Sequence, residues 1–358
     1  MALPFFDRGI KTKRDQIIAV DLGGRTTKAI HLQRRGDGFA LCGYAMMDAP
    51  VFEKSLPLEL LTEHLQAVNQ ALGAKTKALA LTLGVNDAVV RPVDMPRLPV
   101  EDLRQVLKLS SKTYLQQDLS NHVFDCYPII SLHKPAGGEA TPGAAGLQKQ
   151  KVLVTAAKQQ LIADLIEGSR VAGFTAECIV PGLIGPVNSF ELAMPEAFKN
   201  ECVAIVDIGF RNSTICILQN GEFVLNRTVA IGGDRLTSVL SESMNISYAE
   251  AEGIKVGVAH EVQSALESSL MPLGRELRAS IDFFEHQQDK TVTGVYISGG
   301  SSRSEVIMNA LQTELMVECK TWDPTGFLKM ELPPNQVGEI EQVAPQLVVA
   351  VGAAIAAL

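Results

Sequence analysis

The stretch from residue 17 to residue 32, IIAVDLGGRTTKAIHL, decides the fold. An apolar run leads directly into Asp21, and a second apolar run follows Lys28. The short segment between them is rich in glycines and hydroxyls, which predicts a β-hairpin with a polar tip. Such a tip suits a phosphate, because glycines admit backbone N–H groups and hydroxyls and Lys28 supply donors. Asp21 fits only if a cation such as Mg²⁺ lies between it and the phosphate. An ordinary glycine-containing hairpin turn is the alternative.

The same pattern recurs between residues 203 and 218, VAIVDIGFRNSTICIL. Again an apolar run ends at an aspartate, Asp207, and a glycine and a polar tip precede the next apolar run. Two copies of this pattern predict two similar halves that face each other. A third element, residues 295–302 (VYISGGSS), is a strand that ends in two glycines ahead of a helix. Such a turn suits the sugar or phosphate of a nucleotide.

Composition excludes several classes of protein. The chain has 358 residues, enough for two domains, with 46% hydrophobic residues and a net charge of −8, so no basic surface for nucleic acid is expected. The first 15 residues lack the apolar core of a secretory signal, and the apolar run 347–358 is too short to cross a bilayer. We expect residues 1–15 to be a loose lead-in, with contact between its aromatic and basic residues and a membrane surface as the alternative.

The six cysteines are scattered, without a CxxC motif. They are expected to be reduced thiols of a cytoplasmic protein rather than disulfides or zinc ligands.

The order of predicted elements divides the chain into three parts. Residues 1–88 and 181–200 form a first domain that begins with the first hairpin. Residues 89–180 have the order β-α-β-β-α-β and are predicted to be an inserted α+β subdomain, with a flexible Gly/Ala/Pro-rich loop at 135–148. Residues 201–358 form the second domain, which ends in an alanine-rich helix, 346–358, able to pack closely.

Two residues of the second domain share a helix face. Glu252 and Lys255 lie three positions apart in a predicted helix. A solvated ion pair worth a few tenths of a kcal/mol is the alternative to a binding role.

The two hairpins and the Gly-Gly turn together resemble the phosphate-one, phosphate-two and adenosine motifs of the actin-like ATPase clan. Within that clan, the subdomain inserted before the second hairpin is similar to that of the cell-division protein FtsA and of the type IV pilus assembly protein PilM. Residues 231–255, IGGDRLTSVLSESMNISYAEAEGIK, resemble a segment that both families share. FtsA-like proteins continue past the alanine-rich helix into a membrane helix, so the PilM family is favoured. The resemblance covers residues 16–358.

This resemblance implies an actin-like (ribonuclease H-like) α/β fold of two domains and a cytoplasmic, ATP-binding adaptor of the inner-membrane pilus platform. PilM-like proteins bind the cytoplasmic N-terminal peptide of a PilN-like membrane protein in a groove between the first domain and the insert. Other platform proteins are further implied partners, and association with the membrane is indirect.

The resemblance also assigns site residues. Asp21 and Asp207 are implied to hold hydrated Mg²⁺. The implied phosphate-binding residues of the two hairpins are Gly23, Gly24, Thr26, Thr27, Lys28, Gly209, Asn212, Ser213 and Thr214. Those implied for ribose and adenine are Gly232, Gly233, Glu252, Lys255, Gly299, Gly300 and Ser301.

Some residues depart from the family pattern. Arg25 and Arg211 are bulky for phosphate-loop tips, so each is expected either to reach the γ-phosphate or to point to solvent, with solvent favoured for at least one. Glu191 and Asn188 lie where a residue that positions the attacking water would be, but surface helix positions are favoured for both. We therefore expect ATP binding with weak or absent hydrolysis. An FtsA-like filament former and a sugar-kinase-type phosphotransferase are the alternative functions.

Overall fold

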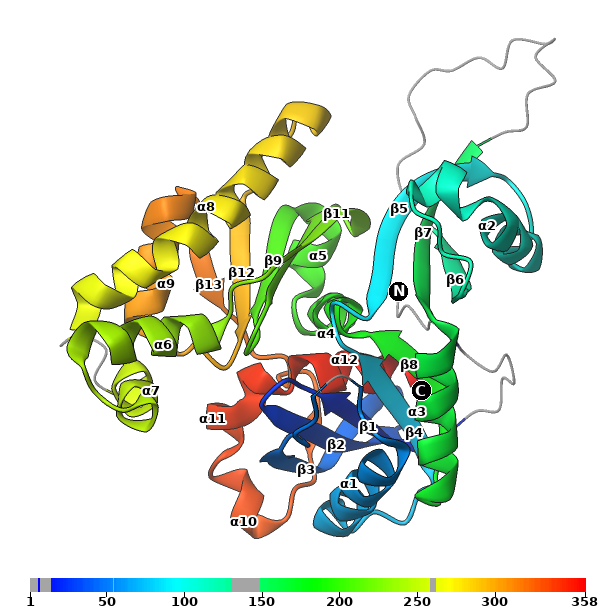
Figure 1. Cartoon of the computed structure of the whole chain (residues 1–358), viewed down its shortest axis with the longest axis horizontal. Helices are drawn as coiled ribbons and strands as arrows, with labels where there is room; N and C mark the ends of the chain where they lie inside the picture. Colours follow the sequence, from blue (N-terminus) through cyan, green and yellow to red (C-terminus); the bar gives the residue numbers. More distant parts are fainter. Residues whose placement is uncertain (1–5, 7–13, 54, 130–148, 258–261) are drawn as a thin grey trace.

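Two sheets of similar design dominate the computed structural model (Figure 1), which describes residues 6, 14–53, 55–129, 149–257 and 262–358. Most of the N-terminal lead-in and the predicted loop 135–148 lie outside the described residues. Each large sheet begins with a three-stranded antiparallel meander and continues with parallel strands beside the first strand of that meander. The two similar halves predicted from the hairpins are confirmed, as is the α/β fold that the resemblance implies.

The first sheet has the strand order β14-β3-β2-β1-β4-β8. Its strands are β1 (Gln16–Leu22), β2 (Thr26–Arg35), β3 (Gly38–Asp48), β4 (Ala78–Leu83), β8 (Thr175–Pro181) and β14 (Lys329–Met330). Helices α1 (Leu58–Leu72) and α3 (Gln159–Val171) pack on one face, where Ile18 and Val20 are buried. Ile17 and Ala19 are buried on the opposite face. Because neighbouring strand residues point to opposite faces, a strand covered on both sides is apolar at every position.

The second sheet has the order β11-β10-β9-β12-β13. Its strands are β9 (Cys202–Ile208), β10 (Ser213–Gln219), β11 (Glu222–Val229), β12 (Gly294–Gly299) and β13 (Cys319–Thr321). Its helices are α5 (Pro195–Asn200), α6 (Gly233–Met244), α7 (Tyr248–Gly257), α8 (Gln263–Gln288) and α9 (Glu305–Leu315). Helices α8 and α9 cover one face, so β9, like β1, lies in the middle of a covered sheet.

Two helices join the halves into one core (Figure 1): α4 (Gly185–Ala193) and α12 (Val348–Ala357). They touch backbone to backbone, since a Cβ on Gly352 would lie 1.9 Å from the carbonyl oxygen of Gly185. Phe190 of α4 extends toward the second sheet and meets the rings of Tyr296 and Trp322 at 4.7 and 5.2 Å between centroids. The close packing expected of the alanine-rich helix is confirmed.

The inserted subdomain is shorter than predicted. It consists of β5 (Ala88–Pro96), α2 (Val100–Leu115), β6 (His122–Pro128) and β7 (Lys149–Lys158), in a sheet of order β5-β7-β6 that stands apart from the large sheets (Figure 1). The elements β-α-β-β-α-β do follow one another in the chain, but the last two belong to the first domain. Strand β8 pairs in parallel with β4, and α3 packs on α1, because their apolar residues complete the first sheet and its covering layer. The predicted range 89–180 therefore ends about twenty residues too late.

The end of the chain also departs from the predicted range 201–358. Strand β14 pairs with β3, with Lys329 beside Ala40, and α12 packs on β1 and β4 of the first sheet. The short helices α10 (Pro334–Val337) and α11 (Ile340–Val343) lie on this return path. Within the described ranges no single helix has the length and apolarity to cross a bilayer. The pair 340–346 and 348–357, bent by 74°, meets that test only when both segments are taken together.

Candidate functional site

Each hairpin brings an aspartate to the end of its first strand. Asp21 is the next-to-last residue of β1, opposite Lys28 of β2, and Asp207 is the next-to-last residue of β9, opposite Thr214 of β10. Lys28 Nζ lies 3.1 Å from Asp21 Oδ2, and the hydroxyl of Thr82 donates to Asp21 Oδ1 at 3.0 Å. Thr214 and Lys28 therefore hold equivalent positions in the two halves, and one half carries a cation where the other carries a hydroxyl.

The two aspartates influence each other and Lys28 across the space between the halves. Burial raises the pKa of Asp207 to about 6, although Lys28 and a hydrogen bond from Ser298 Oγ at 3.1 Å act in the opposite direction. Burial lowers the pKa of Lys28, but the charges of Asp21 and Asp207 outweigh it and the net shift is upward. A bound cation would stabilise the ionised form of Asp207, which is disfavoured by burial and by the nearby charge of Asp21.

Two predicted phosphate ligands point away from this cluster. Thr27 and Ser213 lie opposite Leu22 and Ile208 in their ladders, one position beyond the aspartates, so they face the other side of each sheet. Thr27 is fully buried, with Oγ1 2.7 Å from Nε2 of His64. The hydroxyl of Ser213 donates to the carbonyl oxygen of residue 231 at 2.7 Å. Both predicted assignments are corrected here, whereas Thr26 and Asn212 stay half-buried at the hairpin tips.

The glycines mark close approaches between the segments that meet at the site. A Cβ on Gly299, where φ is +95°, would lie 2.3 Å from the carbonyl oxygen of Ile208, so this turn accepts only glycine. A Cβ on Gly232 would meet the carbonyl oxygen of Phe210 at 2.4 Å. Gly233 opens α6, and its Cβ position lies 3.2 Å from Ser301 Oγ and 3.7 Å from the carbonyl oxygen of Gly209.

The other predicted glycines lie on the same segments. A Cβ on Gly23 would lie 2.8 Å from Lys28 Nζ, and one on Gly24 would lie 3.6 Å from the Phe210 ring of the second hairpin. Gly300 lies in the turn after β12, where a Cβ would be 3.7 Å from the side-chain oxygen of Gln346. The two hairpin tips, the start of α6 and the turn after β12 thus converge, as the sequence predicted.

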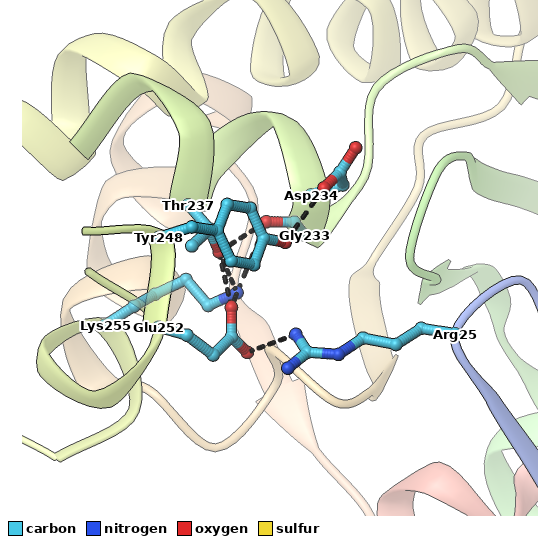
Figure 2. A network of polar contacts seen from close by, with 7 residues as sticks. All are labelled: Arg25, Gly233, Asp234, Thr237, Tyr248, Glu252 and Lys255. Atoms are coloured by element: carbon cyan, nitrogen blue, oxygen red, sulfur yellow. Dashed lines mark hydrogen bonds and ion pairs between the residues drawn. The ribbon is translucent and has the colours of Figure 1, made fainter. Parts of the chain in front are cut away.

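Lys255 and Glu252 share one face of α7, as predicted, and take part in the network of Figure 2. Lys255 Nζ donates to three oxygens: Glu252 Oε2 at 2.8 Å, Thr237 Oγ1 at 2.8 Å and the carbonyl oxygen of Gly233 at 3.3 Å. Burial lowers the pKa of Lys255. Burial acts to raise the pKa of Glu252, but hydrogen bonds from Lys255 and Thr237 lower it below its ordinary value. Lys255 is therefore saturated and fixes the start of α6, while Glu252 keeps its second oxygen available.

Several residues of this network were missed by sequence reasoning. Thr237 bonds both members of the Glu252–Lys255 pair, and Tyr248 donates to Asp234 Oδ1 at 2.8 Å. Burial and this hydrogen bond raise the pKa of Tyr248 to about 12. Tyr248 lies four residues before Glu252, so helical spacing alone could have placed it on the same face.

Arg25 crosses from the first hairpin to this network. Its Nη1 lies 3.4 Å from Glu252 Oε1 (Figure 2). Its guanidinium carbon lies 5.7 Å from the centroid of the Phe210 ring and 5.9 Å from that of the Tyr248 ring. Neither predicted alternative, the γ-phosphate or solvent, anticipated this contact. Arg211, at the tip of the second hairpin, is exposed.

Asn188 is not the surface residue that was expected. It is buried in α4, and its Nδ2 donates to the carbonyl oxygen of Gly352 at 3.2 Å. Glu191 is half-buried. In the part of the chain that the structure describes, no three His, Cys, Asp or Glu residues form a metal-binding group. A cation at this site would therefore have Asp21 and Asp207 as its carboxylates and would keep several waters, as Mg²⁺ does.

Comparison with known proteins gives the family. The model of the type IV pilus assembly protein PilM family matches residues 19–358. This chain belongs to the PilM family. The solved PilM-PilN type IV pilus biogenesis complex contains a similar chain, with 19% identity and a TM-score of 0.80 over 97% of this chain and 99% of that one. The likeness to that structure shows a shared fold along the whole PilM chain.

More distant relatives share the architecture. Cell division protein FtsA of Bacillus subtilis (strain 168) is 22% identical over 261 residues, which is 68% of this chain and 58% of FtsA. The chain thus spans little more than half the length of that relative. MreB5 of Spiroplasma citri, solved with bound ADP, has a TM-score of 0.56 at 10% identity over 95% of both chains. These likenesses place the PilM chain within the actin-like fold.

Proposed function

We propose that this PilM-family protein is an ATP-binding adaptor of the type IV pilus inner-membrane platform. The observation that carries the proposal is the match of the PilM family model to residues 19–358. The converging hairpin tips, the start of α6 and the turn after β12 support a nucleotide as the ligand, and an actin-like neighbour was solved with bound ADP.

The residues present fit Mg²⁺ and ATP. Asp21 and Asp207 offer the hard oxygen ligands that Mg²⁺ prefers, and Lys28 already pairs with Asp21 at 3.1 Å. Gly24 leaves backbone exposed at the hairpin tip, whereas Gly233 is buried at the start of α6. The buried hydroxyl of Ser304, in the turn after β12, has no hydrogen-bond partner among the described residues and suits a polar ligand atom.

In this assignment each residue has a limited role. Asp21 and Asp207 hold the metal, which when bound neutralises phosphate charge. Thr26, Asn212 and the hairpin backbone bind phosphate oxygens, and Glu252 Oε1 accepts from the ribose. Asn188 is engaged by α12, so it does not position a water. This engagement supports the weak or absent hydrolysis that we propose.

The partner we propose is the cytoplasmic N-terminal segment of a PilN-like membrane protein, which would bring the adaptor to the inner membrane. A solved PilM chain of closely similar fold is named as a complex with PilN. A hollow of about 280 Å³ lies where the insert meets both halves, lined by Val85, residues 88–91, Gln117, Leu183 and residues 226–228. It is bordered by β5, an edge strand to which an extended peptide can add. We place the tail at this junction, next to the boundary between the first domain and the insert.

The test is calorimetric titration of a synthetic N-terminal peptide of the PilN-like protein, with and without Mg²⁺ and ATP. We expect peptide binding, and an equal factor by which ATP raises peptide affinity and peptide raises ATP affinity. Thr228→Arg, which fills the hollow, should weaken the peptide at least tenfold, whereas Thr313→Arg on the exposed surface of α9 should not. No peptide binding by the wild-type protein would refute the adaptor role.

A further inference from the structure

The guanidinium of Arg25 lies in a setting that a nucleoside would also fit. It is a planar group within 6 Å of two aromatic ring centroids, those of Phe210 and Tyr248. It also faces the carboxylate of Glu252 (Figure 2). Nucleobases stack on the same ring faces, and ribose hydroxyls donate to the same kind of oxygen. The first half of the molecule therefore offers its own side chain to a surface that belongs to the second half.

The network leaves one oxygen of Glu252 for this contact. Oε2 accepts from Lys255 and Thr237, both at 2.8 Å or less, and both of these residues are buried. Oε1 faces Arg25 at 3.4 Å, from the open side of α7 (Figure 2). A ligand that approaches Oε1 from the same side competes with Arg25 for this oxygen.

Only the side chain of Arg25 needs to move. Its backbone carbonyl accepts from the amide of Ala49 at 2.8 Å, which ties the hairpin tip to the end of β3. The side chain itself is 46% exposed. Exposed ion pairs contribute little, so the contact can be exchanged for another at small cost.

We propose that Arg25 is an internal ligand of the nucleoside site: it links the two halves through Glu252 when no nucleotide is bound, and it leaves when the nucleoside part of ATP enters. This inference rests on the proposed nucleotide function. In this proposal Arg25 regulates that site, because a nucleotide can bind only when the ion pair between Arg25 and Glu252 is broken.

The first measurement needs no nucleotide. Hydrogen exchange of the backbone amides of residues 22–27 and 248–256 is compared between the wild-type protein and Arg25→Ala, with circular dichroism to verify folding. Arg211→Ala is the matched control, because it removes an exposed arginine from the other hairpin tip, and no ion pair joins that arginine to Glu252 among the described residues. We expect exchange in both segments to be about twofold to fivefold faster in Arg25→Ala alone, the range measured for exposed ion pairs. Unchanged exchange overturns the proposal.

The second measurement is the affinity for adenosine, which lacks the phosphates that a free arginine could attract. Arg25→Ala should bind adenosine about twofold to fivefold more tightly than the wild-type protein, and Arg211→Ala should not. Adenosine binding by Arg25→Ala that is equal to or weaker than that of the wild-type protein would overturn the proposal that Arg25 competes with the nucleoside. If neither the wild-type protein nor the variant binds ATP or adenosine, the proposed nucleotide function fails, and the exchange experiment alone still decides whether Arg25 holds the halves together.

Discussion

Replacing Asp207 by asparagine is expected to stabilise the nucleotide-free protein. The pKa of Asp207 lies at about 6 instead of the ordinary 3.8, because its carboxylate is buried and faces Asp21. A tenfold change in acid strength corresponds to 1.36 kcal/mol, so at pH 8 the ionised side chain costs about 3 kcal/mol of folding free energy. Asparagine removes this charge, and its oxygen can still accept the hydrogen bond from Ser298.

The pH dependence gives the prediction its sign. An acid whose pKa is raised on folding destabilises the protein when it is ionised, so the gain from Asp207→Asn is largest above pH 6 and falls to about half at pH 5. The assay is urea unfolding at both pH values without nucleotide. Asp21→Asn is the control, and it should give no gain, because it leaves buried Lys28 without its partner at 3.1 Å. A loss of stability in Asp207→Asn at pH 8, or a gain that is the same at both pH values, would refute the reasoning.

Three further predictions concern the same cleft and the helices behind it. Mg²⁺-ATP affinity measured by calorimetry should fall about tenfold between pH 7 and pH 5, as Asp207 becomes protonated, and a flat profile would exclude it as a metal ligand. Gly352→Ala should lower the free energy of unfolding by about 1–3 kcal/mol, since its Cβ meets the α4 backbone, whereas Gly253→Ala on the open surface of α7 should be neutral or stabilising. Thr27→Val should cost about 1–2 kcal/mol of stability and leave ATP affinity unchanged. Thr26→Val should lower ATP affinity and leave stability unchanged, and equal effects of the two variants on affinity would contradict the assignment of Thr26 alone to phosphate.

The sequence was sufficient to predict the two similar halves of the fold. An apolar run that leads into aspartate, followed by glycine and a polar tip, predicts a covered strand with a charge near its end, and both copies have this form. The same period-two alternation could also have separated Lys28 from Thr27 and Thr214 from Ser213. This alternation places Thr27 and Ser213 on the opposite face from the aspartates, so only the remaining tip hydroxyls can serve phosphate.

The boundaries of the insert could not be predicted from local pattern, because β8 is an ordinary apolar strand that fits a small subdomain as well as a large sheet. Its partner, β4, lies about a hundred residues earlier in the chain, and only tertiary pairing decides between them. The contact of Arg25 with Glu252 is non-local in the same way, since the two residues are on opposite halves. Side chains that reach across a cleft leave no periodic signal in a sequence.

The most direct test of the central claim is calorimetric titration of Mg²⁺-ATP into the wild-type protein and into Asp21→Ala. The account predicts a single Mg²⁺-dependent site in the wild-type protein and binding at least tenfold weaker in the variant, with the circular dichroism spectrum unchanged because Asp21 lies at a strand end beside the hairpin tip. Equal affinity in both proteins, or no binding by the wild-type protein, would contradict the claim that the paired hairpins form a nucleotide site.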